Sequence, residues 1–111
     1  MRLNNQDLYE FLIEKDILVL YHANTVRTSL TYFEQNGLLS RGAVEQLNLT
    51  QTEQSSDEAD QLLNVWNDVF LDSTDLHTFF GRQNYYGPVV FEFDISLLQN
   101  IDYEVWITKD N

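Results

Sequence analysis

The fold is best predicted from residues 17–25, which have the sequence ILVLYHANT. The first five of these residues form a continuous apolar run without polar alternation, which is typical of a strand buried on both faces. Asn24 and Thr25 follow, and both residue types are favoured at the position that precedes the first turn of a helix. The stretch therefore predicts a buried central strand over residues 17–21 that leads directly into a helix.

Amphipathic helices are predicted on both sides of this strand. Residues 5–15 carry apolar residues at helical spacing after an asparagine that can cap the N-terminus of the helix. The second helix has one apolar stripe, formed by Val26, Leu30 and Phe33. Asn36 and Gly37 are expected to end this helix, with Gly37 in the left-handed conformation that glycine adopts without steric cost.

The second half of the chain predicts shorter elements. Ser55 and Glu58 have the spacing of a capping box and predict a helix whose apolar face extends to Trp66. Pro88 precedes a strand over residues 89–93, since proline is tolerated at the first position of a strand. Further elements are predicted as a strand at 68–71, a helix of one or two turns at 73–80, and a final strand at 103–108. Residues 43–49 are compatible with a strand or with a turn of helix.

The order of these elements predicts an α+β fold with a small mixed sheet and about three to four helices. With 111 residues, the chain has the size of one domain, so we expect a single α+β domain over residues 1–111. The absence of cysteine excludes disulfides, Cys-ligated zinc and thiol catalysis. The longest apolar run, residues 17–21, is too short to span a bilayer, and a cytoplasmic location is expected.

The charge of the chain is strongly acidic, with a formal net value of −12. This charge disfavours direct binding to nucleic acid and to anionic lipid, since both are negatively charged. The imbalance is largest between Arg41 and Arg82, where eight acidic residues occur without any lysine or arginine. Such a segment can be an ordinary solvated surface. It can also bind a basic protein or mimic the phosphate backbone of a nucleic acid.

Four short blocks occur in the order of a known fold. They are residues 20–25 (LYHANT), 37–42 (GLLSRG), 68–75 (DVFLDSTD) and 86–94 (YGPVVFEFD). Over roughly residues 17–98 the chain resembles the N-terminal half of ADP-ribosyltransferase folds, including the DNA-targeting toxin branch. The resemblance implies NAD as the ligand. It also implies an incomplete fold, since the chain ends before the second half of such an enzyme.

The resemblance assigns roles to particular residues. His22 takes the place of the histidine that contacts a ribose hydroxyl of the dinucleotide. The remaining cofactor-binding candidates are Asn24, Thr25, Ser73 and Tyr86. Glu104 is the candidate for the late glutamate that stabilises positive charge at the anomeric carbon. The complete enzyme would bind NAD in a bent form, expel nicotinamide and transfer ADP-ribose to a nucleophile. Because the chain has no clear late glutamate, we expect weak activity or none.

Each of these residues also has a purely structural interpretation. His22 can form a hydrogen bond at the end of a strand, and Asn24 or Thr25 can cap a helix. Ser73 can cap the helix predicted after it, while Tyr86 can close the edge of the core. The spacing of Asp72, Asp75 and His77 is unspecific for a metal, so no metal is expected.

A second hypothesis comes from a different class of protein. The chain can be a non-catalytic interaction protein that forms a homodimer or uses its acidic surface to bind a basic protein or to mimic nucleic acid. An apolar final strand at 103–108 would favour this hypothesis, because an exposed strand edge readily pairs with another chain. A symmetric dimer would then complete the sheet.

Overall fold

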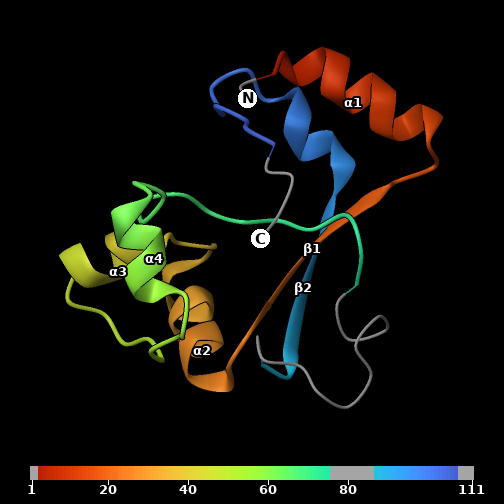
Figure 1. Cartoon of the computed structure of the whole chain (residues 1–111). Coiled ribbons are helices and arrows are strands. Elements are labelled where there is room, and N and C mark those ends of the chain that lie inside the picture. Colours follow the sequence, from red (N-terminus) through yellow and green to blue (C-terminus); the bar gives the residue numbers. More distant parts are fainter. Residues whose placement is uncertain (1–2, 76–86, 108–111) are drawn as a thin grey trace.

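A computed structural model describes residues 3–75 and 87–107 of the protein (Figure 1). Within these residues the fold is α+β, as predicted. Its elements, in chain order, are α1 (Asn5–Glu14), β1 (Val19–Asn24), α2 (Val26–Gln35), α3 (Arg41–Gln46), α4 (Asp57–Leu62), β2 (Val89–Asp94) and the 3₁₀ helix η1 (Ile95–Gln99).

The sheet consists, in the described part of the chain, of β1 and β2 in antiparallel pairing. Its register places His22 opposite Phe91 and Asn24 opposite Val89. β2 forms where it was predicted, whereas β1 lies later than the predicted strand at 17–21. Asp16 has a left-handed backbone (φ 59°), and the N–H of Ile17 still bonds to the last turn of α1, so the extended strand begins two residues further on. As a result, His22 and Asn24 lie within the strand and not beyond its end.

Two predicted strands are absent from the described residues. Residues 68–71 are irregular, and the backbone of the segment pairs with the sheet through a single bridge between Tyr21 and Asp72, whose two N···O distances are both 2.8 Å. Residues 103–107 do not form a strand either. After the turn at Asn100, the N–H of Leu3 bonds to the carbonyl of Val105 at 3.1 Å, so this segment lies against the N-terminus of the chain.

Two details of the predicted helix ends are wrong. α2 ends at Asn36 and Gly37 as predicted, but the left-handed residue is Asn36 (φ 64°) and not Gly37. Asparagine is the residue other than glycine that tolerates this conformation best. The predicted capping box at Ser55 does not form: α4 follows Ser56, whose side chain makes no capping hydrogen bond. The helix is also shorter than predicted and ends before Trp66.

α3 overlaps residues 43–49, the segment whose sequence was compatible with either a strand or a turn of helix. Ser40 caps this helix, because its hydroxyl accepts a hydrogen bond from the N–H of Ala43 at 3.0 Å. For the helix predicted at 73–80, Ser73 and Thr74 form a bend, and the segment from residue 76 lies outside the described residues.

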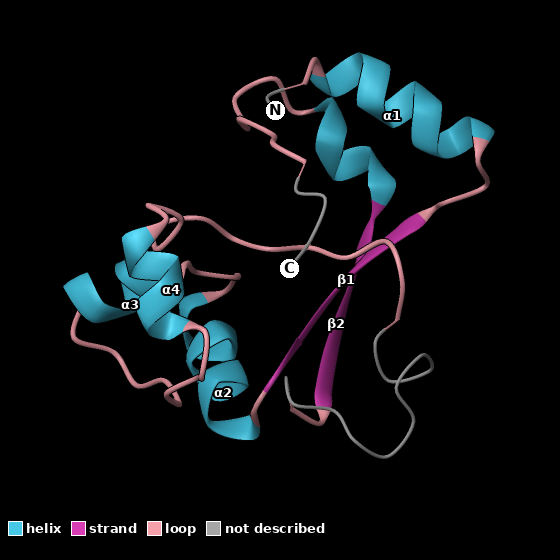
Figure 2. Ribbon diagram, in the orientation of Figure 1, coloured by secondary structure: helices cyan, strands magenta, loops and turns pink. Residues whose placement is uncertain are grey.

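The helices gather at the two ends of the strand pair, with α1 and η1 at one end and α2, α3 and α4 at the other (Figure 2). The core at the first end is a cluster of four buried hydrophobic residues from α1, β1 and η1, namely Leu8, Leu20, Ile95 and Leu98. At the second end, the fully buried side chains are Val44, Thr28 and Ser29. Two of these three are polar: the hydroxyl of Thr28 accepts a hydrogen bond from the N–H of Thr52 at 2.9 Å, whereas the buried hydroxyl of Ser29 has no hydrogen-bond partner among the described residues.

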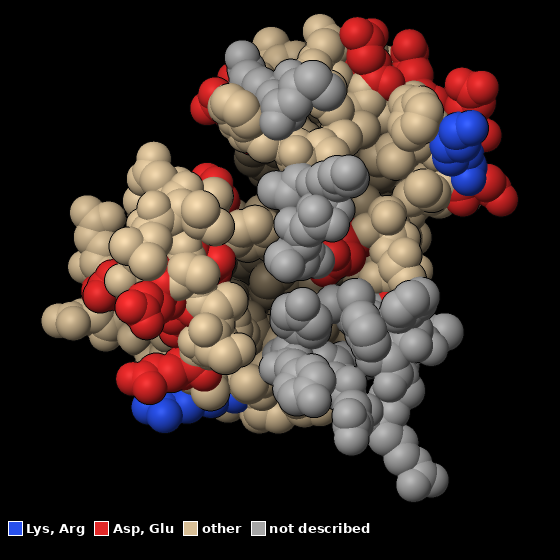
Figure 3. Space-filling view, viewed as in Figure 1, with Lys and Arg blue, Asp and Glu red and all other residues tan. Residues whose placement is uncertain are grey.

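The acidic side chains do not form one stripe on the face shown in Figure 3, where they lie in separate groups divided by uncharged surface. Among the described residues, no helix combines the length and hydropathy that crossing a membrane requires.

Candidate functional site

His22 lies at the centre of a hydrogen-bonded cluster on β1. Its Nδ1 atom is 2.8 Å from the carbonyl oxygen of Phe70, and its Nε2 atom is 3.2 Å from Nδ2 of Asn24. A carbonyl oxygen can only accept, so Nδ1 must carry the proton. Nε2 then accepts a hydrogen bond from the Asn24 amide. Both ring nitrogens are therefore engaged within the chain, and the arrangement selects one neutral tautomer.

The environment of His22 lowers its pKa. Burial is the largest cause, since the charged imidazolium loses its hydration. The hydrogen bond to Phe70 and the negative charge of Asp72 act in the opposite direction without overcoming burial. Protonation of Nε2 would also direct an N–H toward the amide hydrogens of Asn24. The ring is consequently neutral at pH 7.

Asn24 joins the strand to the helix that follows it. The residue is 3% exposed, and its Oδ1 atom accepts hydrogen bonds from the N–H of Thr25 at 2.9 Å and from Nε2 of Gln54 at 3.4 Å. Its Nδ2 atom donates to the hydroxyl of Tyr32 at 3.2 Å in addition to His22. Every polar atom of this buried amide therefore has a partner, as buried polar groups require.

Thr25 caps α2 and also holds a distant loop. Its hydroxyl accepts a hydrogen bond from the N–H of Thr28 at 3.3 Å and lies 2.8 Å from the hydroxyl of Thr52. The N–H of Thr52 donates in turn to the hydroxyl of Thr28 at 2.9 Å. The predicted capping role of Thr25 is confirmed, and the same hydroxyl fixes the position of the loop around Thr52.

Gly87 covers the junction between β1 and α2. Its φ is +116°, and a Cβ atom at this position would lie 2.4 Å from the carbonyl carbon and oxygen of Asn24. No side chain fits at such a distance. The backbone that enters β2 therefore packs directly on the peptide bond between Asn24 and Thr25.

The other predicted site residues lie apart from this cluster. Ser73 is exposed and follows the bridge between Tyr21 and Asp72. Glu104 is exposed and precedes Val105, which bonds to Leu3 at the α1 end of the molecule. Tyr86 lies outside the described residues, as does His77. Hydrogen bonds thus join three of the predicted site residues: His22, Asn24 and Thr25.

Arg41 is engaged within the chain. Its Nε atom is 2.6 Å from Oδ1 of Asp57, and its Nη2 atom is 3.0 Å from Oδ2 of the same carboxylate. Nη2 also donates to the carbonyl of Thr52, and the guanidinium lies 5.7 Å from the centre of the Trp66 ring. The two-point contact between Arg41 and the carboxylate of Asp57 fixes the first turn of α4 against α3.

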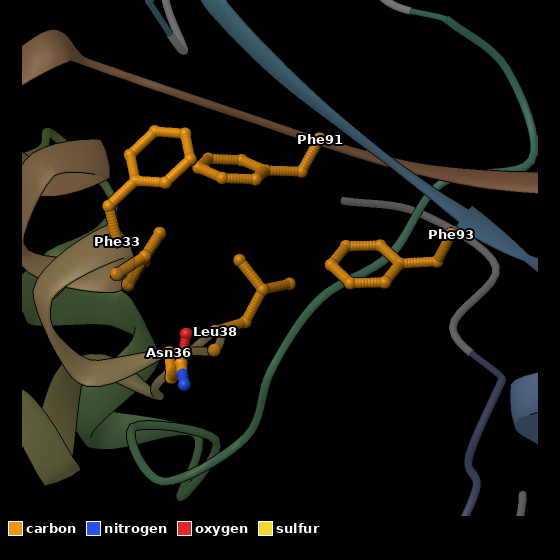
Figure 4. Close-up of a pocket in the computed structure, with 7 residues that line it drawn as sticks. Phe33, Asn36, Leu38, Phe91 and Phe93 are labelled. Atoms are coloured by element: carbon orange, nitrogen blue, oxygen red, sulfur yellow. The ribbon is translucent and has the colours of Figure 1, made fainter.

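A pocket that the sequence did not indicate lies beside the cluster, between the end of α2 and strand β2 (Figure 4). Its volume is about 200 Å³, and its lining is Tyr32, Phe33, Asn36, Gly37, Leu38, Phe91 and Phe93. The rings of Phe33 and Phe91 lie against each other, with their centroids 5.4 Å apart. Phe91 also contacts Tyr32 edge-on at 5.8 Å. The pocket was missed because its residues come from segments more than 50 residues apart.

The polarity of α2 is reversed relative to an ordinary surface helix. The buried residues of the helix are Thr28, Ser29, Thr31 and Tyr32, which carry hydroxyl groups. The opposite side of the helix, which we call the outer face of α2, consists of Val26, Leu30 and Phe33. These side chains are 53%, 55% and 66% exposed. An apolar stripe normally faces the core, whereas the apolar stripe of α2 is exposed.

No family model, curated protein or solved structure matches the chain. Within the described residues, no group of three or more histidine, aspartate or glutamate side chains is placed to hold a metal ion.

Proposed function

We propose that this protein is a non-catalytic interaction protein that binds another protein chain through the outer face of α2. The observation that carries the proposal is the exposure of Val26, Leu30 and Phe33 on a helix whose hydroxyl-bearing side is buried. Phe33 also lines the pocket beside β2, so the apolar surface continues from the helix into a concavity. Large apolar side chains next to a pocket are typical anchors of protein interfaces.

The hydrogen-bonded cluster around His22 supports the non-catalytic part of the proposal. A general base needs a free lone pair within reach of its substrate. The only lone pair on the neutral His22 ring accepts a hydrogen bond from Asn24, which is itself buried. The cluster therefore acts as a structural joint that fixes α2 relative to the sheet. This joint holds the outer face of α2 in a defined position.

Site-specific photo-crosslinking in the cells that naturally produce the protein would test the proposal. A benzoylphenylalanine would replace Leu30 on the outer face of α2, and Leu62 of α4 would carry it in a matched control. Leu62 is 80% exposed, against 55% for Leu30, so random collisions with other proteins reach position 62 at least as often as position 30. We expect a discrete adduct from position 30 and none from position 62. Equal labelling at both positions would contradict the proposal.

NAD binding is the second candidate function. It is favoured by the hydrogen bonds that join His22, Asn24 and Thr25, three of the residues that an ADP-ribosyltransferase-like site would use. Calorimetric titration with NAD would test it, with His22→Ala as the variant. Binding that the substitution abolishes would support a dinucleotide site. Absence of binding at millimolar NAD to the folded protein would reject it.

A further inference from the structure

The outer face of α2 has the spacing of a helix-pairing seam. Val26, Leu30 and Phe33 follow one another at intervals of four and three residues, the alternation by which apolar positions repeat in coiled coils. These three side chains are each more than half exposed. The seam they form on α2 is therefore open to a second helix.

The charges on α2 lie beside this seam and have opposite signs. Arg27 and Glu34 are the two charged residues of the helix, and both are exposed. Each directly follows an apolar residue of the seam, Val26 for Arg27 and Phe33 for Glu34. They therefore occupy the same flank, one near each end of the helix. When two copies of such a helix pair antiparallel, Arg27 of one copy lies opposite Glu34 of the other.

We propose that the partner of the outer face of α2 is a second copy of this chain, with the two helices antiparallel about a twofold axis; the proposal rests on the interaction function stated above. In this arrangement Leu30 of each copy packs against Phe33 of the other. Two Arg27–Glu34 ion pairs form, one at each end. A twofold axis makes every contact occur twice, as in other isologous interfaces.

One observation favours a second copy over a basic partner. The helix carries one positive and one negative charge on the same flank, so the seam is self-complementary although the molecule has a net charge of −12.

Charge-swap variants test the arrangement by sedimentation equilibrium of the full chain, up to about 1 mM, the weak end of specific association. Arg27→Glu and Glu34→Arg each replace two attractive pairs by two repulsive ones. Each substitution is expected to raise the dissociation constant of the dimer about tenfold, given the modest strength of exposed ion pairs. An equimolar mixture of the two variants, and the double variant Arg27→Glu/Glu34→Arg, should both recover the affinity of the unchanged protein.

The two single variants also separate specific pairing from the effect of net charge. Arg27→Glu makes the chain more negative, whereas Glu34→Arg makes it less negative. General repulsion between acidic molecules would therefore weaken association in the first variant and strengthen it in the second. The proposed pairing predicts weakening in both. Thermal unfolding of each variant would check that the fold is intact, as expected for exposed positions.

Three results would overturn the proposal: a protein that stays monomeric over the whole concentration range, a Glu34→Arg variant that associates more tightly, or a mixture of variants that fails to recover affinity. A strictly monomeric protein that still gives a discrete adduct from position 30 would reject the second copy as partner. It would leave the interaction function intact, with a different protein as the partner. A strictly monomeric protein that also gives no discrete adduct from position 30 would reject both the second copy as partner and the interaction function.

Discussion

His22 and Asn24 show how two side chains on one strand determine a protonation state. The carbonyl of Phe70 holds the proton on Nδ1, and the Asn24 amide occupies Nε2. The amide itself is held by bonds to the backbone of Thr25 and the hydroxyl of Tyr32. A proton added to Nε2 of His22 would break the hydrogen bond that this atom accepts from Asn24, in addition to charging a buried ring.

Stability is expected to fall as the pH is lowered below about 6.5, the ordinary pKa of histidine. Burial holds the pKa of His22 below that value in the folded protein, so the unfolded chain binds the proton first. The loss begins as the pH falls through the unfolded pKa and ends below the folded pKa. Urea unfolding at several pH values between 5 and 8 would measure it. In a His22→Gln variant, the free energy of unfolding should depend less on pH over this range.

The sequence predicted the role of Thr25 but not that of Asn24. A threonine just before a helix has a local partner, the N–H three residues later, so the sequence alone contains the information. The partners of Asn24 include Tyr32 and Gln54, and Gln54 is 30 residues away. Such a contact depends on the tertiary fold, which local patterns do not contain. The resemblance that pointed to His22, Asn24 and Thr25 named residues that do lie together, although their function as an NAD site stays a prediction.

At the scale of elements, the end of α2 divides between two residues what one glycine often provides, namely a left-handed backbone and the absence of a side chain. Asn36 has the left-handed backbone, and a Cβ atom on Gly37 would have open space around it. Asn36→Ala is expected to lower the free energy of unfolding by about 1 kcal/mol, because alanine tolerates the left-handed region poorly. Gly37→Ala should leave it unchanged or raise it by about 0.5 kcal/mol, because it restricts the unfolded chain. Thermal or urea unfolding of the two variants, at concentrations below self-association, would compare them. An equal loss in both would contradict this division.

The elements that the sequence predicted well are α1, α2 and β2, each of which has a clear apolar period and a local start signal. β1 began later than expected because α1 ends through a left-handed Asp16, a feature that hydrophobic pattern does not encode. α4 lacks the expected capping box, and the carboxylate of Asp57, inside the box, accepts hydrogen bonds from Arg41 and from the N–H of Gln54. The strand predicted at 68–71 has only one bridge to β1, so its apolar residues alone did not make a strand.

At the scale of the whole molecule, the acidic charge opposes folding as well as association. A net charge of −12 on 111 residues destabilises the compact state through repulsion. Raising the salt concentration from about 20 to 200 mM shortens the Debye length from roughly 20 to 7 Å. The melting temperature should therefore rise with salt. Replacing an exposed acid at the end of α1 in Glu14→Gln should reduce this dependence, and a melting temperature that falls with salt would contradict the argument.

The buried face of α2 has a consequence for how the protein responds to temperature. Threonine hydroxyls join α2 to residues 50–52, where an ordinary domain would bury aliphatic side chains. Exposure of apolar surface raises the heat capacity of the unfolded state, and exposure of polar surface lowers it. The heat-capacity change of unfolding should therefore lie below the usual value of about 12 cal/mol/K per residue. The stability curve becomes flat, so the protein resists cold denaturation and keeps nearly constant stability over a wide range of temperature, which scanning calorimetry of the dilute protein would reveal.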